Sequence, residues 1–558
     1  MKERLLSRFT PPNREWLNKI SNEFHVSQFI SQIVWNRGIK SLDSVKNFLR
    51  PDSQPPLDSF LLKDMHRAVH RIELAIQNHE KICVYGDYDV DGMTSVAILT
   101  RALENLGADV VFYIPDRESE GYGLNVSAIR GIIRRGAKLI VTVDNGIAAV
   151  NEIEATKDQI DFIVTDHHEI ESEIPQALAV IDPKRTDCPY PNKNLCGCGV
   201  AFKLIQALYR QLRGELFLSD LDIVALATIA DLVPLIHENR KIVRRGLNIL
   251  SDTPCLGLQA LIESAGLSGR RITEENVGFI LAPRLNAAGR MFKPELGVEL
   301  LTTRDPNRAR EIAETLEEFN SNRKELERQV FIEAEEKFLA EQKKSPSAII
   351  VDGENWHPGV IGLAASRLQE KYYLPTLVFT HTGGILAGSC RSIDSLNIFD
   401  ALSEFADLYE KYGGHSKAAG LSIRTENFPI FRKKFLEYVA THTTSKDFIR
   451  PLVIDCMLDP SKVTLELISQ VENLAPFGVG NSSPIFGWKN VRASNVRLMG
   501  KDQSHLGFSV GSVRCVGWRM AEEFDLVSNR EFTMIFSIEK NEFNGSTLPQ
   551  CNLIYISP

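Results

Sequence analysis

The chain has 558 residues, of which 43% are hydrophobic and 24% are charged, and its formal net charge at pH 7 is -8. This length exceeds what one hydrophobic core supports and predicts about three to five domains. The composition excludes a wholly disordered chain, and the acidic balance excludes a uniformly basic nucleic-acid coat. No apolar segment has the length of a secretory signal or a membrane span, so we expect a cytoplasmic protein.

The predicted elements begin after an N-terminal region at residues 1–56. In residues 57–304, short β-branched-rich runs alternate with segments of helical periodicity. The predicted strands lie at residues 81–85, 110–114, 139–143, 160–164 and 179–181. This alternation predicts an α/β domain with a mostly parallel sheet and helices on both faces.

Three further regions follow. Residues 305–345 are highly charged, contain apolar residues at helical spacing and predict one long connecting helix. Strand and helix patterns resume at residues 346–445 and predict a second α/β domain. Residues 450–558 contain short strands separated by turns, including a hairpin signal at Asn544-Gly545, and predict a small OB-like β-barrel.

The nine cysteines are scattered along the chain, and their number and spacing do not indicate a disulfide framework. The nearest approach to a zinc motif is the set Cys188, Cys196 and Cys198. These three lack the paired CxxC spacing typical of zinc sites, so a tight turn around Gly197 is favoured over a metal knuckle. We expect most cysteines to be reduced core residues.

Side chains with metal-binding chemistry follow three of the predicted strands. They are Asp87, Asp89 and Asp91 after the first strand, Asp144 after the third, and Asp166, His167 and His168 after the fourth. The carboxyl ends of parallel strands meet at one rim of a sheet, where ligands bind. Carboxylates this close repel one another unless cations offset their charge, and imidazole beside them suits Mn2+, whereas Mg2+ would use mainly the oxygens. The sequence therefore predicts a divalent-metal centre at this rim.

The DxDxDG spacing of Asp87, Asp89 and Asp91 also occurs in calcium-binding EF-hand loops. Such a loop requires an acid at its twelfth position, which is Ile98 here, and the flanking segments are a strand and a helix. Calcium binding through this motif is therefore disfavoured. A single aspartate of the group can also cap a helix, so the metal hypothesis depends on all three strand ends.

Longer segments resemble motifs of a known enzyme family. VYGDYDVDGMTS (84–95), VTVDNGI (141–147), VTDHHE (164–169) and ATIADLVPL (227–235) resemble successive motifs of the DHH phosphoesterase family, and RLNAAGRM (284–291) resembles the next motif of its RecJ branch. WHPGVIGLAASRL (356–368), GSCRS (388–392) and GGHSKAAG (413–420) are similar to the DHH-associated domain. The resemblance covers most of the chain in order.

The resemblance implies a centre that holds one or two Mn2+ or Mg2+ ions. The main ligands would be Asp89, Asp91, Asp144, His167 and Asp231. Asp87 would bind metal or support a ligand, Asp166 would orient the histidines, and His168 would contact the scissile phosphate. All eight residues are candidate catalytic residues.

Asp231 lies in an apolar stretch beside Ile229, Leu232 and Val233. A carboxylate buried there is costly unless it is paired, so a metal partner explains Asp231 better than a solvated helix face does. A helix cap is the alternative.

The resemblance also implies substrate-binding residues, namely Asn286, Arg290, Arg391, Ser392 and His415. Asn286 would donate to phosphate, and Arg290 would neutralise charge in the transition state. Without the resemblance, a structural turn with a surface arginine explains the same pair. Cys390 stands where the family pattern has glycine, which puts the backbone geometry at this position in question.

The implied function is metal-dependent hydrolysis of single-stranded DNA from 5' to 3', releasing mononucleotides, in DNA repair and recombination. A cleft between the two α/β domains would exclude duplex, and the barrel would extend the DNA track. The implied partners are single-stranded DNA, a single-strand-binding protein and a RecQ-type helicase. In the barrel, Phe508, Trp518 and Phe532 are aromatic candidates for base stacking, but we expect each in the core and name no DNA-binding residue there.

Two other functions are open from the sequence. A related phosphoesterase would act on short oligonucleotides, cyclic dinucleotides or pyrophosphate, but the N-terminal extension, the segment at residues 284–291 and the barrel favour a long polymer. A non-catalytic replication-fork scaffold with the same fold would lack the metal-binding acids. All the motif acids and both histidines are present, which disfavours the scaffold.

Overall fold

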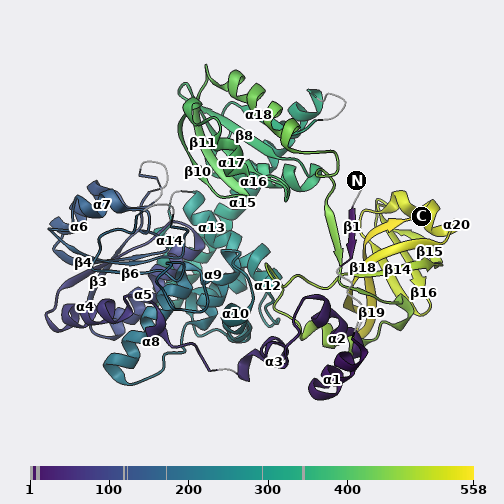
Figure 1. The fold of residues 1–558 in the computed structure, drawn as a ribbon, viewed down its shortest axis with the longest axis horizontal. Helices are drawn as coiled ribbons and strands as arrows, with labels where there is room; N and C mark the ends of the chain where they lie inside the picture. Colours follow the sequence, from purple (N-terminus) through teal and green to yellow (C-terminus); the bar gives the residue numbers. More distant parts are fainter. Residues whose placement is uncertain are drawn as a thin grey trace.

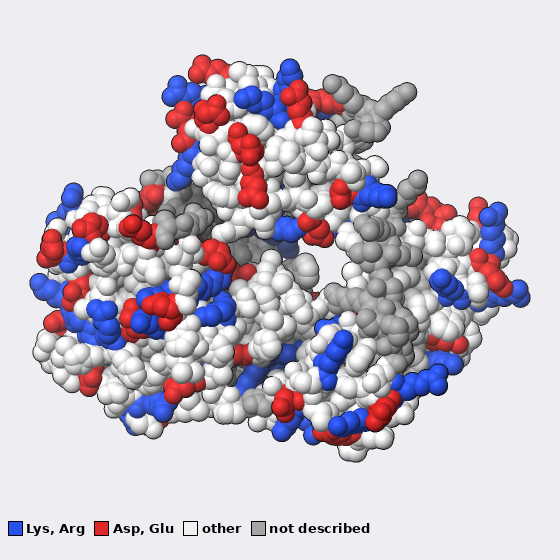
Figure 2. Space-filling model, in the orientation of Figure 1, with Lys and Arg blue, Asp and Glu red and all other residues white. Residues whose placement is uncertain are grey.

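The computed structural model describes residues 4–7, 13–53, 55–116, 120–121, 123–170, 173–291, 293–341, 346–543 and 545–558. Figure 1 shows an α/β domain, a second domain above it and a β-rich domain at the opposite side of the molecule. Basic and acidic residues are interspersed over the face shown in Figure 2, so no continuous basic surface covers that face. Within the described ranges, no helix has the length and apolar character needed to cross a membrane.

The first domain is built on a five-stranded parallel sheet in the order β3-β2-β4-β5-β6. The strands are β2 (Lys81–Tyr85), β3 (Asp109–Tyr113), β4 (Ala137–Val143), β5 (Asp161–Thr165) and β6 (Ala179–Ile181). Each strand overlaps a predicted run. The parallel pairing brings all five carboxyl ends to one rim of the sheet, as the sequence predicts.

Helices cover both faces of this sheet, which confirms the expected α/β architecture. Val84 packs into a core with α4, α5 and α8, whereas the next residue, Tyr85, packs into a core with α6 and α7. Successive side chains of a strand point to opposite faces, so one strand contributes to both cores. The helices are α4 (Met65–Gln77), α5 (Val90–Asn105), α6 (Val126–Arg134), α7 (Val150–Glu154) and α8 (Gly197–Arg213).

The chain continues into a helical region that ends in one long helix, α15 (Pro306–Ala340), of 35 residues. The helices before it are α9 (Leu221–Ala230), α10 (His237–Leu250), α11 (Leu256–Ser264), α12 (Glu274–Asn276), the π-helical turn η3 (Val277–Leu281), α13 (Ala282–Arg290) and α14 (Glu295–Thr302). The Asp305 side chain caps α15 by accepting a hydrogen bond from the Asn307 N–H. The predicted connecting helix is confirmed, and its expected last residues, 342–345, lie outside the described part of the chain.

The second domain contains a mixed five-stranded sheet in the order β10-β11-β9-β8-β7, in which only β7 and β8 pair in parallel. Its strands are β7 (Ile349–Gly353), β8 (Thr376–Thr382), β9 (Ile385–Arg391), β10 (Tyr409–Gly414) and β11 (Ala418–Arg424). Helices α16 (Pro358–Tyr372), α17 (Ile398–Ser403) and α18 (Phe428–His442) complete the domain. Cys390 is a buried residue of β9 without a positive φ, so this strand does not require glycine there.

The C-terminal barrel contains a seven-stranded sheet in the order β13-β14-β18-β19-β17-β16-β15. The strands are β13 (Cys456–Met457), β14 (Phe486–Val491), β15 (Ser494–Met499), β16 (His505–Val510), β17 (Val513–Gly517), β18 (Phe532–Phe543) and β19 (Ser546–Ser557). Helices α19 (Leu465–Glu472) and α20 (Phe524–Asn529) pack against it. Strands β18 and β19 pair antiparallel on either side of the predicted Asn544-Gly545 turn, of which Asn544 lies outside the described residues.

The N-terminal helices α1 (Arg14–Phe24), α2 (Gln28–Asn36) and α3 (Leu42–Leu49) share a hydrophobic core with this barrel. Strand β1 (Arg4–Ser7) pairs in parallel with β12 (Pro451–Ile454), so the start of the chain lies beside a segment more than 400 residues later. In the barrel, Phe508 and Phe532 are buried, as expected. The expectation was wrong for Trp518, whose surface is 58% exposed because it follows β17 and leaves the core.

Candidate metal centre

The first acidic loop lies where β2 ends and α5 begins. Asp89 is the N-cap of α5, and its Oδ1 accepts a hydrogen bond from the Gly92 N–H over 3.0 Å. A Cβ atom on Gly92 would lie 2.5 Å from the Asp87 carbonyl oxygen, so the loop closes only around glycine. Asp89 therefore caps the helix, as the alternative interpretation proposed, and also lies with Asp87 and Asp144 in one group of adjacent carboxylates.

Asp91 is buried beneath the N-terminus of α8. The Gly197 and Cys198 N–H groups donate to its two carboxylate oxygens over 2.6 Å and 2.9 Å. A Cβ atom on Gly197 would lie 2.5 Å from the Asp144 Cβ, so glycine is needed for this close approach. Cys196 begins the helix, with its Sγ accepting a hydrogen bond from Gly199. The prediction of a tight turn around Gly197 was wrong, because Gly197 is the first residue of α8, and this helix start supports two acids of the site.

Asp144 follows β4 in a left-handed backbone conformation, with φ of 61°. Its N–H donates to the Thr165 carbonyl oxygen over 3.1 Å, which ties the ends of β4 and β5 together. Left-handed geometry is uncommon for residues other than glycine, and such strain is concentrated at functional sites. The backbone thus directs Asp144 toward His167, which follows β5.

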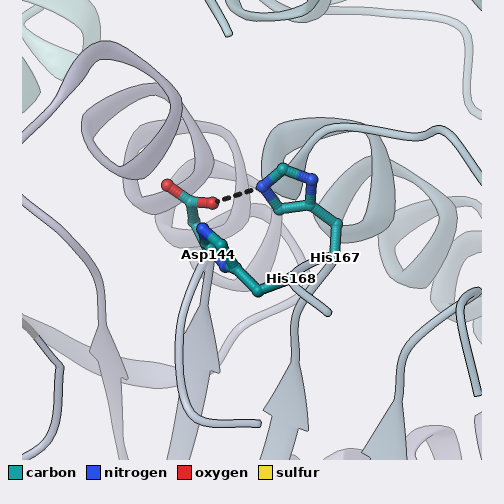
Figure 3. A group of neighbouring side chains, drawn as sticks. All are labelled: Asp144, His167 and His168. Atoms are coloured by element: carbon teal, nitrogen blue, oxygen red, sulfur yellow. Dashed lines mark ion pairs between the residues drawn. The ribbon is translucent and has the colours of Figure 1, made fainter. Parts of the chain in front are cut away.

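His167 lies at the centre of the acidic group. Its Nε2 is 3.1 Å from Asp144 Oδ1, and it is 3.7 Å from the nearer oxygens of Asp91 and Asp231. Figure 3 shows the Asp144 carboxylate facing the His167 ring at the ends of the strands. Burial lowers the pKa of His167 to about 4, although Asp91 opposes this shift. The ring is therefore neutral at pH 7, which is the form that binds metals.

The carboxylates around His167 have the opposite shift. Burial, together with the charges of Asp91 and Asp89, raises the pKa of Asp144 well above its usual range. The same causes raise the pKa of Asp231 to about 9. Burial and mutual repulsion therefore outweigh the charges of His168 and Lys184, which lower the pKa of Asp231, and a divalent cation would supply further compensating charge.

The side chains fit a divalent metal by their chemistry and their spacing. Three overlapping groups have potential ligand atoms within 4.8 Å of one another: Asp144, His167 and His168; Asp91, His167 and Asp231; and Asp87, Asp89 and Asp144. The shared members Asp144 and His167 link the three groups into one continuous set of potential ligands. Oxygen donors with one or two imidazoles suit Mn2+, and the carboxylate-rich side suits Mg2+.

His168 forms a pair with Asp166, and the ring Nδ1 lies 2.7 Å from Asp166 Oδ1. Burial alone would lower the pKa of His168, but the hydrogen bond and charge of Asp166 outweigh it and raise the pKa to about 9. Asp166 is buried and also accepts hydrogen bonds from the N–H groups of Ile147 and His167. His168 is thus positively charged at pH 7, unlike His167.

Asp231 is less buried than its apolar surroundings in the sequence indicate. It is the C-terminal cap residue of α9, its side chain is 22% exposed, and the following Leu232 is 69% exposed. The apolar stretch ends with α9, because Leu232 has a φ of 58° and turns toward solvent. The Oδ2 atom of Asp231 is nevertheless buried, and within the described ranges it has no hydrogen-bond donor.

The two expected phosphate-binding residues of the first domain make structural contacts. Asn286 accepts a hydrogen bond from the Val90 N–H over 3.2 Å, which connects α13 to the acidic loop. Arg290 donates to the Gly359 carbonyl oxygen over 2.7 Å, which connects the first domain to α16 of the second. A Cβ on Gly289 would lie 2.0 Å from the Tyr88 carbonyl oxygen, so this segment packs directly on the acidic loop.

A cleft of about 630 Å³ separates the metal-binding rim from the second domain. His167, His168 and Asp231 line one side, and His415 lines the other. Arg391 and Ser392 are not among the lining residues: Arg391 donates to the Ser366 and Ser389 hydroxyls, and Ser392 donates to the Leu396 carbonyl oxygen. Of the three residues expected to hold a nucleotide end, only His415 reaches the cleft.

Sequence reasoning missed other residues of the cleft, namely Lys184, Asn397 and Phe399. Lys184 lies in the loop three residues after the end of β6, at the same rim as Asp144 and Asp166, so its position near a strand end could have identified it. Asn397 and Phe399 lie at the start of α17, and no local motif marks them.

A parallel sheet with acids and histidines at one rim, a long helix, a second mixed domain and a barrel define a class of multidomain phosphoesterase. Residues 81–229 match the DHH family, N-terminal domain; residues 345–441 match the DHHA1 domain; and residues 454–555 match the RecJ OB domain. These matches follow the order of the three folded regions.

Whole-chain relatives define the family more closely. The single-stranded-DNA-specific exonuclease RecJ of Bacillus subtilis (strain 168) is 38% identical over 97% of this chain and 69% of its own length. The RecJ of Haemophilus influenzae is 34% identical over 93% of this chain and 94% of its own length. The chain belongs to the RecJ family.

A solved structure agrees with this assignment. The Thermus thermophilus RecJ in complex with Mn2+ matches all of this chain and 79% of its own chain, with a TM-score of 0.87 and 29% identity. The same protein in complex with Mg2+ matches with a TM-score of 0.82 and 29% identity, over all of this chain and 78% of its own.

Proposed function

We infer that this chain is a divalent-metal-dependent exonuclease that acts on single-stranded DNA. The observation that carries this inference is the convergence of Asp91, Asp144 and Asp231 on the neutral His167 at the rim of the sheet. The relatives are named single-stranded-DNA-specific exonucleases, and the related solved structures contain Mn2+ or Mg2+.

We assign the metal ligands to Asp89, Asp91, Asp144, His167 and Asp231, with Asp87 in contact with or supporting this set. A divalent ion held there would lower the pKa of a bound water molecule and would offset negative charge on phosphate oxygens. The hydrogen bonds from the α8 N-terminus orient Asp91, and the left-handed turn orients Asp144. These fixed positions reduce the reorganisation needed during reaction.

His168 is the residue that we assign to the scissile phosphate. Its pKa of about 9 keeps the ring protonated at neutral pH, and it lines the cleft. The ionised Asp166 accepts from Nδ1 and leaves Nε2 directed away from it, so an imidazolium N–H can donate to a phosphate oxygen. His415 is the residue of the second domain that we assign to the substrate, because it lines the cleft; Asn286 and Arg290 remain proposed substrate contacts, whereas Arg391 and Ser392 do not line the cleft.

We further propose that the enzyme degrades the strand from 5' to 3' and releases mononucleotides in DNA repair and recombination. The cleft supports this proposal, because His168 of the rim and His415 of the second domain both line it and can contact one strand end. A single-strand-binding protein and a RecQ-type helicase are the proposed partners, and the cytoplasm is the proposed location. The nine free, buried cysteines suit a reducing compartment.

The test uses long oligonucleotides labelled at either end, single-stranded or in blunt duplex, with Mn2+, Mg2+ or chelator. We expect metal-dependent release of a labelled mononucleotide first from the 5' end of the single strand. Rapid cleavage of duplex, or activity without a divalent ion, would contradict the assignment. Exclusive cleavage of a dinucleotide would favour the related phosphoesterase that acts on short compounds.

A further inference from the structure

The strand ends at the rim carry different side chains from one side of the sheet to the other. In the strand order β3-β2-β4-β5-β6, the aspartates proposed as metal ligands follow β2 and β4, and the two histidines follow β5. The loop after the edge strand β6 contributes a lysine, Lys184. A phosphate at this rim would therefore have carboxylates on its β2–β4 side and an ammonium group on its β6 side.

The loop after β6 holds Lys184 in a defined position. Asp182, which directly follows the strand, is fully buried, and its Oδ1 accepts a hydrogen bond from the Lys184 N–H over 2.7 Å. The Lys184 side chain is 24% exposed, and its Nζ lies 3.0 Å from Glu169 Oε1. The contact with Asp182 uses the backbone of Lys184, so a substitution of the lysine side chain leaves the loop anchored.

Lys184 lines the proposed catalytic cleft together with His168 and Asp231. Burial is the main influence on the pKa values of Asp231 and His167, and the charge of Lys184 lowers both of them. The ammonium group is therefore within electrostatic reach of the metal-binding groups. It faces the same cleft as the protonated His168, which we assign to the scissile phosphate.

The ion pair with Glu169 does not by itself explain this position. Glu169 is 66% exposed, and exposed ion pairs contribute little to stability. Glu169 also lines the cleft, so a phosphate that enters there would compete with its carboxylate for the ammonium group. The pair with Glu169 can thus give way to a contact with substrate.

We propose that Lys184 is a further catalytic residue, which contacts the scissile phosphate together with His168 from the β6 side of the rim. This inference rests on the proposed function. The phosphodiester is an anion, and cations that face its oxygens stabilise the negative charge that develops as water attacks. A lysine ammonium group binds phosphate as a point charge with three rotatable donors. Lys184 would therefore stabilise both the bound strand and the transition state.

The first test measures kcat and KM on 5'-phosphorylated oligodeoxythymidylate with Mn2+. Lys184→Gln removes the charge and should lower kcat/KM by about 10- to 100-fold, the range for a lost hydrogen bond to a charged group. Lys184→Arg keeps the charge and should restore most of this loss. The matched control is Lys157→Gln. Lys157 is 30% exposed and also pairs with a glutamate, Glu154, but it is not among the residues that line the cleft, so its kcat/KM should equal that of wild type.

Glu169→Gln separates a contact with substrate from a structural ion pair. If Lys184 serves only to pair with Glu169, Glu169→Gln and Lys184→Gln break the same interaction and should lose activity equally. A contact with phosphate predicts instead that Glu169→Gln keeps or raises kcat/KM, because the competing carboxylate is gone. Equal losses in the two variants would overturn the proposal, and so would a wild-type kcat/KM in Lys184→Gln.

A binding experiment locates the contact on the strand and does not depend on turnover. It uses fluorescence anisotropy with Mn2+ in the Asp144→Asn protein, in which the loss of a ligand charge slows cleavage. With ordinary linkages, adding Lys184→Gln should weaken binding by about tenfold. With an uncharged methylphosphonate at the first linkage from the 5' end, the two proteins should bind equally. With the methylphosphonate at the fifth linkage, the tenfold difference should return. A difference that persists with the uncharged first linkage would place Lys184 on another phosphate and overturn the proposal.

Failure of the proposed function has a different signature. If the wild-type protein does not degrade single-stranded DNA with Mn2+ or Mg2+, the proposed function falls, and the role of Lys184 in that reaction falls with it. If wild type and Lys184→Gln degrade the strand with equal kcat/KM, only the assignment of Lys184 falls.

Discussion

The metal-binding rim and the C-terminal barrel are stabilised by contacts of very different range in the sequence. In the rim, Asp144 and His167 each follow a strand of one parallel sheet, and backbone N–H groups fix the buried Asp91. The barrel shares its core with helices from the start of the chain, and Arg37 donates to Asp455 across that junction. The rim is therefore a locally organised, rigid site. We expect substitutions at the rim to change cleavage activity and substitutions at the barrel to change stability, each with little effect on the other.

The largest expected effect comes from removing one ligand charge at the rim. Asp144→Asn should reduce cleavage of single-stranded DNA by more than about a hundredfold, because losing a residue that merely supports a ligand already costs that much. Cleavage is measured by product release at saturating Mn2+. The melting temperature should not fall and the barrel should stay folded, since the substitution removes a buried negative charge. Turnover at the wild-type rate would contradict the account.

A second prediction tests the packing that supports the rim. Gly197→Ala should reduce activity by about 10- to 100-fold, because the added methyl would displace Asp144 and the α8 N-terminus that orients Asp91. The matched control is Gly131→Ala in α6, where a Cβ meets only the tip of Arg134 at 3.9 Å. The control should keep full activity and gain slight stability. Equal activity of the two variants would show that Gly197 does not position the site.

A substitution at the junction with the barrel should lower the stability of that unit and leave cleavage at the metal-binding rim intact. Arg37 is 6% exposed and donates to Asp455, Asn481 and Ser482. Arg37→Ala should destabilise the N-terminal and barrel unit by about 3–5 kcal/mol, because it breaks the buried ion pair with Asp455. Differential scanning calorimetry measures the unfolding transition. The rate of dinucleotide cleavage should stay within about twofold of wild type, because the substitution does not affect a residue that supports a metal ligand.

The control for Arg37 is Arg328→Ala, which removes an exposed ion pair with Glu325 and should leave the transition unchanged. If Arg37→Ala abolishes dinucleotide cleavage while the first domain stays folded, the two regions are not separable.

The smallest expected effect is a pH dependence of metal stabilisation. In metal-free protein Asp231 keeps its proton up to a pKa of about 9, against 3.8 when unfolded. The stability due to this proton is complete below about pH 4 and is lost as the pH rises through about 9. A bound cation replaces the proton, so the rise in melting temperature with Mn2+ should grow from about pH 6 to about pH 8. Asp231→Asn should reduce this growth, and a constant rise would argue against Asp231 as a ligand.

Much of the rim could be predicted from the sequence, because its parts are local. A strand followed by acids places those acids at the rim, whichever helix packs behind it, so Asp91, Asp144 and His167 were found. Asp231 was found as a ligand candidate, but its exposure was not, because the left-handed turn at Leu232 depends on tertiary packing. Lys184 was missed, although it lies in the loop three residues after β6 at the same rim.

Contacts between distant segments could not be predicted. Nothing near Ile33 or Phe48 indicates that these residues share a core with the barrel, since that packing depends on residues hundreds of positions away. Arg391 and Ser392 lie away from the cleft because hydrogen bonds hold them elsewhere. Their partners are Ser366, Ser389 and Leu396. The local motif does not indicate these contacts, so the sequence placed both residues in the cleft. Trp518 was expected in the barrel core, but β17 ends at Gly517 and Trp518 lies exposed just beyond the strand.

The most direct test of the central claim is the anomalous diffraction signal of Mn2+ in crystals of this protein. The account predicts one or two peaks at the carboxyl ends of β4 and β5, each about 2.0–2.3 Å from ligand atoms that include Asp144 and His167. Peaks elsewhere, or none at this rim in crystals of protein that cleaves single-stranded DNA with Mn2+, would contradict it.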